Sequence, residues 1–177
     1  MAWTTPRTWS DAELENAAIF NTHVRDNFNA VGEHKRIVKS NDETVNNSTT
    51  LQDDAALFWT PEPSSEWVFE MMIHFSSATT PDLKCAWTIP SPGSASQGTY
   101  LRTTGAALTM SAVSSLTTTV TADGAGATIQ PLYFWGRVQV GSGASGNIQF
   151  QWAQNTLEVS DTIVYGQSWL VAHRIDN

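Results

Sequence analysis

The 177-residue sequence has one cysteine and no long apolar run, and each scarcity excludes a class of structure. A single cysteine, Cys85, cannot form an intrachain disulfide, and its neighbours Ala86 and Trp87 favour a buried, inert thiol over a nucleophile. No stretch approaches the roughly 18 apolar residues of a membrane helix. The first residues lack the apolar run of a secretory signal. We therefore expect a product made in the cytosol that does not insert into membranes.

Positive charge is also scarce. Charged residues make up 15% of the sequence, with 9 Lys and Arg against 17 Asp and Glu, so the formal net charge is −8. Basic and acidic residues are equal in number in residues 1–40, so the whole negative net charge lies in residues 41–177. Such a body would repel phosphate groups, which disfavours a nucleic-acid partner. Lys35, Arg36 and Lys39 form a small basic cluster, which we interpret as a solvated face.

Motifs of common active sites are missing as well. There is no His-Glu-Xaa-Xaa-His or Cys/His spacing, no Gly-Xaa-Ser-Xaa-Gly elbow and no phosphate-binding loop. His74 and His173 could meet across two strands and bind a cation, although such histidines are more often packed or interfacial. Asp53 and Asp54 would point to opposite faces of a strand, and a solvated turn fits them better than joint acid–base chemistry. We predict no enzyme, no catalytic residue, no metal and no cofactor.

What is present begins with a helical arm. Ser10 and Glu13 form a capping box, acidic residues fill the first turn and Gly32 provides a stop, which together predict a helix over about residues 11–31. Apolar residues then recur at spacings of three and four, with Asn21 in one inner position, as in a short heptad seam. A helix this short must dock on something, either its own β-domain, sister chains or a host shell. An extended aromatic lead precedes it, and we predict anchoring or oligomer contacts at Trp3, Pro6, Trp9, Leu14, Asn21, Val24, Phe28 and Val31.

Residues 32–50 are mostly polar, which predicts a linker. From residue 51 onward, apolar residues recur at every second position, as they do in strands. Short alternating runs separated by Gly-rich turns predict an antiparallel β-sandwich, jelly-roll-like, over residues 51–177. The fold class is thus mainly β, with an N-terminal α-helical arm. The predicted apolar faces are Trp67, Phe69, Met71, Ile73 and Phe75; Leu132, Phe134, Gly136, Val138 and Val140; Ile148, Phe150 and Trp152; and Trp169, Val171, His173 and Ile175.

The opposite faces of these runs are candidates for contacts with partners. Val68, Glu70, Met72 and His74 form a mixed face suited to an interface. Tyr133, Trp135 and Arg137 alternate with the apolar face of their own run, and we predict them as an exposed platform for a ligand such as a sugar ring. Core or subunit interface is nevertheless the more common role of the tryptophans in this part of the chain.

Several segments resemble proteins of tailed-phage virions. WTTPRTW (residues 3–9) and NTHVRDN (21–27) are similar to an N-terminal segment of such proteins. VNNSTTLQDD (45–54), FSS (75–77) and TTPDLK (79–84) are similar to the start of a β-domain of head-fibre, decoration and tail-associated proteins, and QWAQ (151–154) and GQSWL (166–170) to its closing strands. The resemblance implies a virion component, commonly a homotrimer anchored by its N-terminus, and no catalytic residues.

The leading hypothesis is a capsid decoration or head-fibre protein, whose residues 1–31 bind the major capsid or another virion protein while the β-domain projects as a trimer. The second is a tail-tip or fibre module that binds a receptor or glycan on the host surface. A small hydrolase is the weakest of the three.

Overall fold

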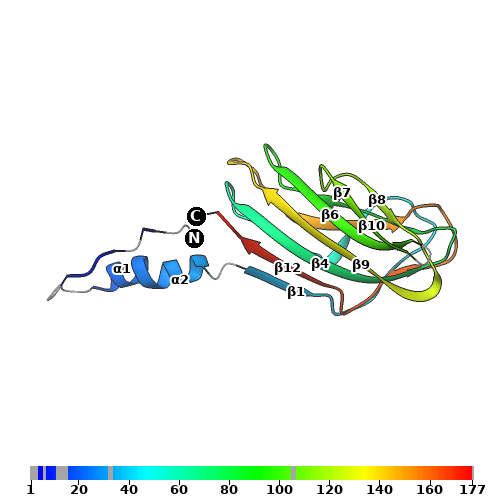
Figure 1. The fold of residues 1–177 in the computed structure, drawn as a ribbon, viewed down its shortest axis with the longest axis horizontal. Helices are drawn as coiled ribbons and strands as arrows, with labels where there is room; N and C mark the ends of the chain where they lie inside the picture. Colours follow the sequence, from blue (N-terminus) through cyan, green and yellow to red (C-terminus); the bar gives the residue numbers. More distant parts are fainter. Residues whose placement is uncertain (1–3, 6, 11–15, 32–33, 105–106, 177) are drawn as a thin grey trace.

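Two antiparallel sheets make up most of the chain in the computed structural model, which describes all residues except 1–3, 6, 11–15, 32–33, 105–106 and 177 (Figure 1). In the described part, the larger sheet has the strand order β1-β12-β4-β9-β6-β7, and β11 pairs with both β4 and β2. Its strands are β1 (His34–Val38), β2 (Glu43–Val45), β4 (Glu66–Ser77), β6 (Ala95–Thr104), β7 (Ala107–Val113), β9 (Gly126–Gln139), β11 (Thr162–Val164) and β12 (Trp169–Arg174). The smaller sheet has the order β3-β10-β5-β8, formed by β3 (Gln52–Trp59), β5 (Leu83–Thr88), β8 (Val120–Ala122) and β10 (Ile148–Gln154). The predicted mainly β class is confirmed.

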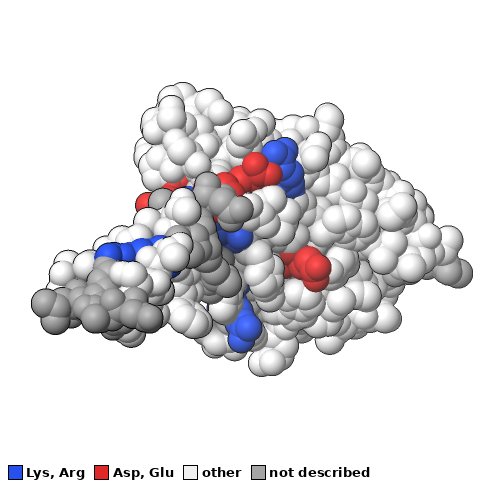
Figure 2. Space-filling view, turned by 60° about the vertical axis from the view of Figure 1, so that its left-hand side comes forward, with Lys and Arg blue, Asp and Glu red and all other residues white. Residues whose placement is uncertain are grey.

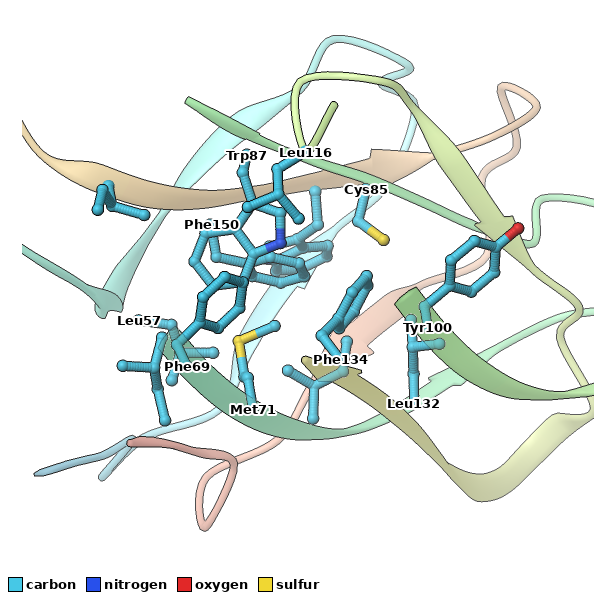
Figure 3. Packing of buried hydrophobic residues seen from close by; sticks show 14 of the residues in the cluster. Leu57, Phe69, Met71, Cys85, Trp87, Tyr100, Leu116, Leu132, Phe134 and Phe150 are labelled. Atoms are coloured by element: carbon cyan, nitrogen blue, oxygen red, sulfur yellow. The ribbon is translucent and has the colours of Figure 1, made fainter. Parts of the chain in front are cut away.

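Aromatic side chains from both sheets meet in the core (Figure 3). Trp87 of β5 lies with its ring centroid 4.8 Å from that of Phe69 on β4 and 5.3 Å from that of Phe150 on β10. Phe134 of β9 lies 5.9 Å from Phe150. The alternating residues predicted to face inward from β4, β9 and β10 are buried, apart from Gly136, which is partly exposed, and this confirms those three faces.

The last strand buries the face opposite to the one predicted. Leu170 and Ala172 are fully buried, whereas Trp169 and Val171 are partly exposed and His173 is exposed. Both faces of β12 carry apolar residues, so alternation alone does not decide which one faces the core. The pairing with β4 decides it, because a shift of one residue in register moves every side chain to the other face.

The predicted linker over residues 32–50 is wrong, because this stretch contributes β1 and β2 to the larger sheet. β1 pairs with β12 from His34 opposite His173 to Val38 opposite Trp169. β2 pairs with β11. β1 is an edge strand, where charged side chains are common because they oppose pairing with another chain. The polar composition of residues 32–50 therefore gave no indication of these two strands.

The arm is helical over α1 (Ala17–Phe20), the π-helical η1 (Asn21–Arg25) and α2 (Asp26–Val31). Its first turn is capped by Asn16, which is extended and whose side-chain oxygen accepts a hydrogen bond from the Ile19 N–H at 3.0 Å. Asn is among the strongest N-cap residues, so the helix begins at Ala17, later than predicted. Residues 11–15, on which most of the predicted capping box falls, lie outside the described part.

Candidate functional site

The outward face of the larger sheet carries the predicted platform. Tyr133 and Trp135 of β9 lie with their ring centroids 5.5 Å apart. Trp169 of β12 joins them, 6.3 Å from Tyr133 in an edge-on arrangement. The alternation of β9 predicted the first two residues, but Trp169 was assigned to the core. Its place beside Tyr133 follows from the register, in which Met72 of β4 pairs with both residues.

Two carboxylates, those of Glu70 and Glu66, accept hydrogen bonds from the polar groups of Tyr133 and Arg137. The Tyr133 hydroxyl donates a hydrogen bond to Glu70 at 2.7 Å. Partial burial, and then the hydrogen bond and negative charge of Glu70, raise the pKa of Tyr133 to about 12. Arg137 donates from Nε to Glu66, and this pairing raises the pKa of the guanidinium further. The three predicted platform residues are thus on one face and held in place.

An open groove of about 890 Å³ runs beside Trp135 on this face. Its wall combines the rings of Phe69, Trp135 and His173 with hydroxyl, amide and charged groups, a mixture that suits a polar ligand with an apolar face. The lining residues are Val68, Phe69, Glu70, Gln97, Gly98, Thr99, Ala112, Val113, Ser114, Trp135, Gly136, Arg137 and His173.

One line of apolar side chains crosses the whole width of this sheet. Directly paired residues on antiparallel strands project from the same side, so the register places these side chains next to one another. Five spacings between neighbouring strands give the line a length of roughly 24 Å. We call it the cross-strand row, and it consists of Val38, Trp169, Met72, Tyr133, Leu101 and Met110.

Both ends of the cross-strand row are open to solvent. Val38 is 61% exposed and Met110 is 66% exposed. The next outward residue of β7, Leu108, is 69% exposed. Charged residues are few and scattered on the face drawn in Figure 2, most of which is formed by uncharged residues. Large apolar groups aligned on a sheet face of a sparsely charged protein are typical of an interface. They extend the mixed face that the sequence predicted on β4.

The arm also leaves apolar side chains uncovered. Figure 1 shows it extending beyond the end of β1 instead of lying across either sheet. Phe28 is 77% exposed, Phe20 is 50% exposed and Trp9 is 39% exposed. Asn27 is buried and fixes the extended lead to the helix, with its side chain bonded to both the N–H and the carbonyl of Thr4 at 2.9 Å.

The predicted anchoring residues are therefore placed only in part. Asn21 and Val24 are partly buried in η1, where the π-turn interrupts the predicted seam, and Phe28 and Trp9 face solvent. Trp3, Pro6 and Leu14 lie outside the described residues, as does the side chain of Val31.

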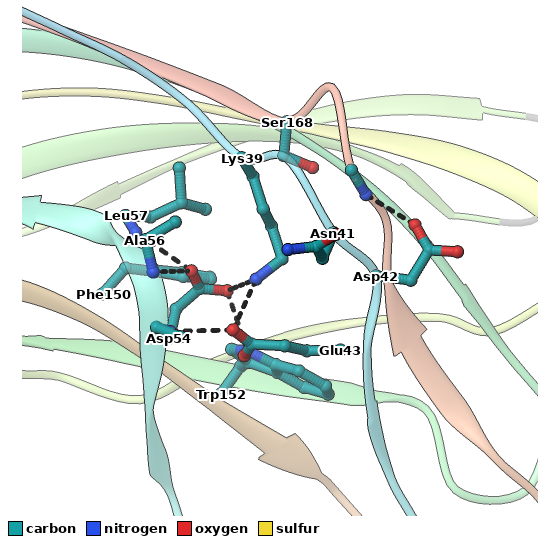
Figure 4. Close-up of polar contacts among 12 residues, drawn as sticks. Lys39, Asn41, Asp42, Glu43, Asp54, Ala56, Leu57, Phe150, Trp152 and Ser168 are labelled. Carbon is teal, nitrogen blue, oxygen red and sulfur yellow. Dashed lines mark hydrogen bonds and ion pairs between the residues drawn. The ribbon is translucent and has the colours of Figure 1, made fainter.

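Sequence reasoning missed a cluster of buried charges between the sheets (Figure 4). The Lys39 ammonium group lies 2.9 Å from Asp54 Oδ2 and 2.7 Å from Glu43 Oε1. The side chain of Lys39 is 2% exposed and that of Asp54 is 0% exposed. The predictions of a solvated basic face at Lys39 and a solvated turn at Asp54 are therefore wrong. Asp53 and Asp54 lie on β3 and differ in burial, as opposite faces of a strand require.

The candidates for metal binding and covalent chemistry are not brought together. His173 pairs with His34, 6.0 Å between ring centroids, whereas His74 pairs with Pro131. Among the described residues, no group of three or more His, Cys, Asp and Glu side chains could hold a metal ion. Cys85 is buried, as predicted, and burial raises the pKa of its thiol.

In class, then, the chain is a mainly β protein with two facing antiparallel sheets, a short helical arm and an uncovered apolar face. No family model matches the sequence, and no curated protein matches it either. In the described part of the chain no helix is both long and apolar enough to cross a membrane.

Proposed function

We propose that this chain is a structural subunit without enzymatic activity that assembles with copies of itself through the outward face of its larger sheet. The cross-strand row is the observation that carries the proposal, because an apolar line across a sheet that is exposed at both ends and partly exposed between them is costly for a protein that remains a monomer. Identical copies bury such a face most simply around a closed symmetry axis. We take the assembly to be a homotrimer of jelly-roll-like domains, as the resemblance to virion proteins implies.

The proposed place of this assembly is a tailed-phage particle, as a capsid decoration or head-fibre protein. The arm supports an anchoring role because Phe20 and Phe28 are exposed on a short helix that extends away from the sheets. A partner such as the major capsid protein would cover them. The trimer would then project from the shell.

Sedimentation of the full chain tests self-assembly. We expect the wild type to sediment as a trimer and Met110→Asp to sediment as a monomer, because a carboxylate at the end of the cross-strand row would be buried without a partner. Leu157→Asp is the matched control, since Leu157 is 62% exposed but lies in the loop after β10. A wild-type chain that stays monomeric at high concentration would refute the assembly. Electron microscopy of intact particles tests the location.

A second function is supported by the groove beside Trp135. An aromatic ring next to hydroxyl and amide groups is suited to stacking against a sugar, so a tail-tip or fibre receptor binder is the alternative. A glycan array separates the two functions. Binding that is lost in Trp135→Ala and retained in Trp9→Ala would favour the receptor binder over a passive shell protein.

A further inference from the structure

The Lys39 cluster has the composition of a covalent cross-link as well as that of an ion pair. A primary amine, a carboxyl group and a second carboxylate lie within hydrogen-bonding distance, and water scarcely reaches the amine of Lys39 and the carboxyl group of Asp54. Lys39 follows β1 of the larger sheet and Asp54 belongs to β3 of the smaller one, so the pair connects the two layers. Figure 4 shows the amine between the two carboxylates, with Phe150 and Trp152 nearby.

Burial makes the charged forms of this pair expensive. Removing an ammonium and a carboxylate from water costs several kcal/mol per ion before their attraction is counted. An amide condensation requires a neutral amine and a carboxylic acid, and one proton passing from the ammonium group to a carboxylate supplies both reactants. Two groups held in contact in one molecule react far faster than the same groups free in solution.

We propose that Lys39 and Asp54 form an intramolecular isopeptide bond, with Glu43 transferring the protons. Glu43 accepts one proton from the ammonium group and passes it to Oδ2 of Asp54, and the neutral amine then attacks Cγ of that protonated carboxyl group. As the Nζ–Cγ bond forms, Glu43 takes a second proton from Nζ and delivers it to Oδ2, and the Cγ–Oδ2 bond breaks. Of the three ammonium protons, one stays on the amide nitrogen and two leave with Oδ2 as water. Glu43 ends unchanged, and neither oxidant nor cofactor is consumed.

The surroundings of Asp54 fit this reaction. Oδ1 accepts hydrogen bonds from the backbone N–H groups of Ala56 and Leu57, each at 3.0 Å. Two fixed N–H donors stabilise the negative charge that develops on this oxygen when the amine adds to Cγ. On the other oxygen, the Trp152 indole N–H donates to Oδ2 at 3.2 Å and stabilises it as the leaving group.

The bond would fasten the segment that carries the arm to the smaller sheet. The backbone hydrogen bonds of β1 hold residues 34–38 to β12 at the edge of the larger sheet. An amide at Lys39 adds a covalent link immediately after that edge strand. A pull on the arm would then act on β3 as well as on β12.

Intact-mass measurement of the purified full chain tests the bond. We expect the wild type to be lighter than its sequence by the mass of one water molecule. Glu43→Gln and Lys39→Arg should both keep the full sequence mass, the first because the proton carrier is lost and the second because the amine is lost. Asp53→Asn is the matched control, since Asp53 is the exposed neighbour of Asp54 on the other face of β3, and it should still lose water.

Trypsin digestion locates the bond. An acylated Lys39 is not a cleavage site, so residues 37–84 should appear as one peptide, internally linked and lighter by one water molecule. A folded wild-type chain with its full sequence mass after prolonged incubation would overturn the proposal. Loss of water with normal cleavage after Lys39 would overturn it too, because that result indicates a cyclic imide at Asp54.

Discussion

Replacing Lys39 by methionine should lower the free energy of unfolding by at least about 3 kcal/mol. Methionine has a similar length and leaves little cavity, so the main effect is that the Asp54 carboxylate, 0% exposed, loses its cation. Breaking a buried ion pair by removing one partner costs about 3–5 kcal/mol. For a domain of this size, a loss of 3 kcal/mol corresponds to a melting temperature lower by about 6–12 °C.

The isopeptide bond would add a second contribution to this loss. A cross-link between residues 15 apart in sequence restricts the unfolded chain, and the disulfide analogy gives about 3 kcal/mol for a loop of this length. Lys39→Met would then cost about 6–8 kcal/mol in total. Glu43→Gln, in which the Lys39 and Asp54 side chains remain, would lose chiefly the cross-link.

Urea denaturation followed by tryptophan fluorescence measures this loss, because the buried tryptophans of the core, Trp152 among them, become exposed to water on unfolding. Lys84→Met serves as the control, since Lys84 lies on β5 outside the cluster and should change stability by no more than about 0.5 kcal/mol. If Lys39→Met lowered the free energy of unfolding by less than about 1 kcal/mol, the burial argument for the cluster would be refuted.

Three further predictions concern the sheet and the arm. Because the pKa of Tyr133 is raised from 10.0 to about 12, the fold favours the protonated phenol, and stability should fall as pH rises from 10 through 12. Tyr133→Phe should flatten that fall in denaturation curves measured on either side of pH 10, and an equally steep loss in the variant would contradict the assignment. Gly136→Ala would place a Cβ atom 2.6 Å from Phe69 Cε1, which should cost about 1–3 kcal/mol of unfolding free energy, and an unchanged urea midpoint would disprove the steric conflict. Phe28→Ser should leave the melting temperature unchanged, because Phe28 is 77% exposed, while weakening binding to particles about tenfold. Wild-type particle affinity in that variant would argue against Phe28 as an anchor.

The local sequence pattern was sufficient to predict the buried residues of every strand that has one clearly apolar face. The alternation in β4, β9 and β10 predicted which residues form the core, because successive side chains of a strand point to opposite sides whatever the strand pairs with. For the same reason Tyr133, Trp135 and Arg137 were placed together on the outward face. The buried thiol of Cys85 also followed from its apolar neighbours.

Pairing between distant segments decided the features that local pattern did not predict, namely the orientation of β12, the strand at residues 34–38 and the buried charges. The side of β12 that faces the core depends on its register with β4, and residues 34–38 become a strand only because β12 offers an edge. Lys39 lies in a polar stretch and Asp54 beside another aspartate, so neither carries a local signal of burial. They meet only where the two sheets pack together. By itself, therefore, the sequence determined the class of the protein and most of its core, whereas tertiary structure decided the cross-strand row and the buried cluster, because both depend on contacts between residues far apart in the chain.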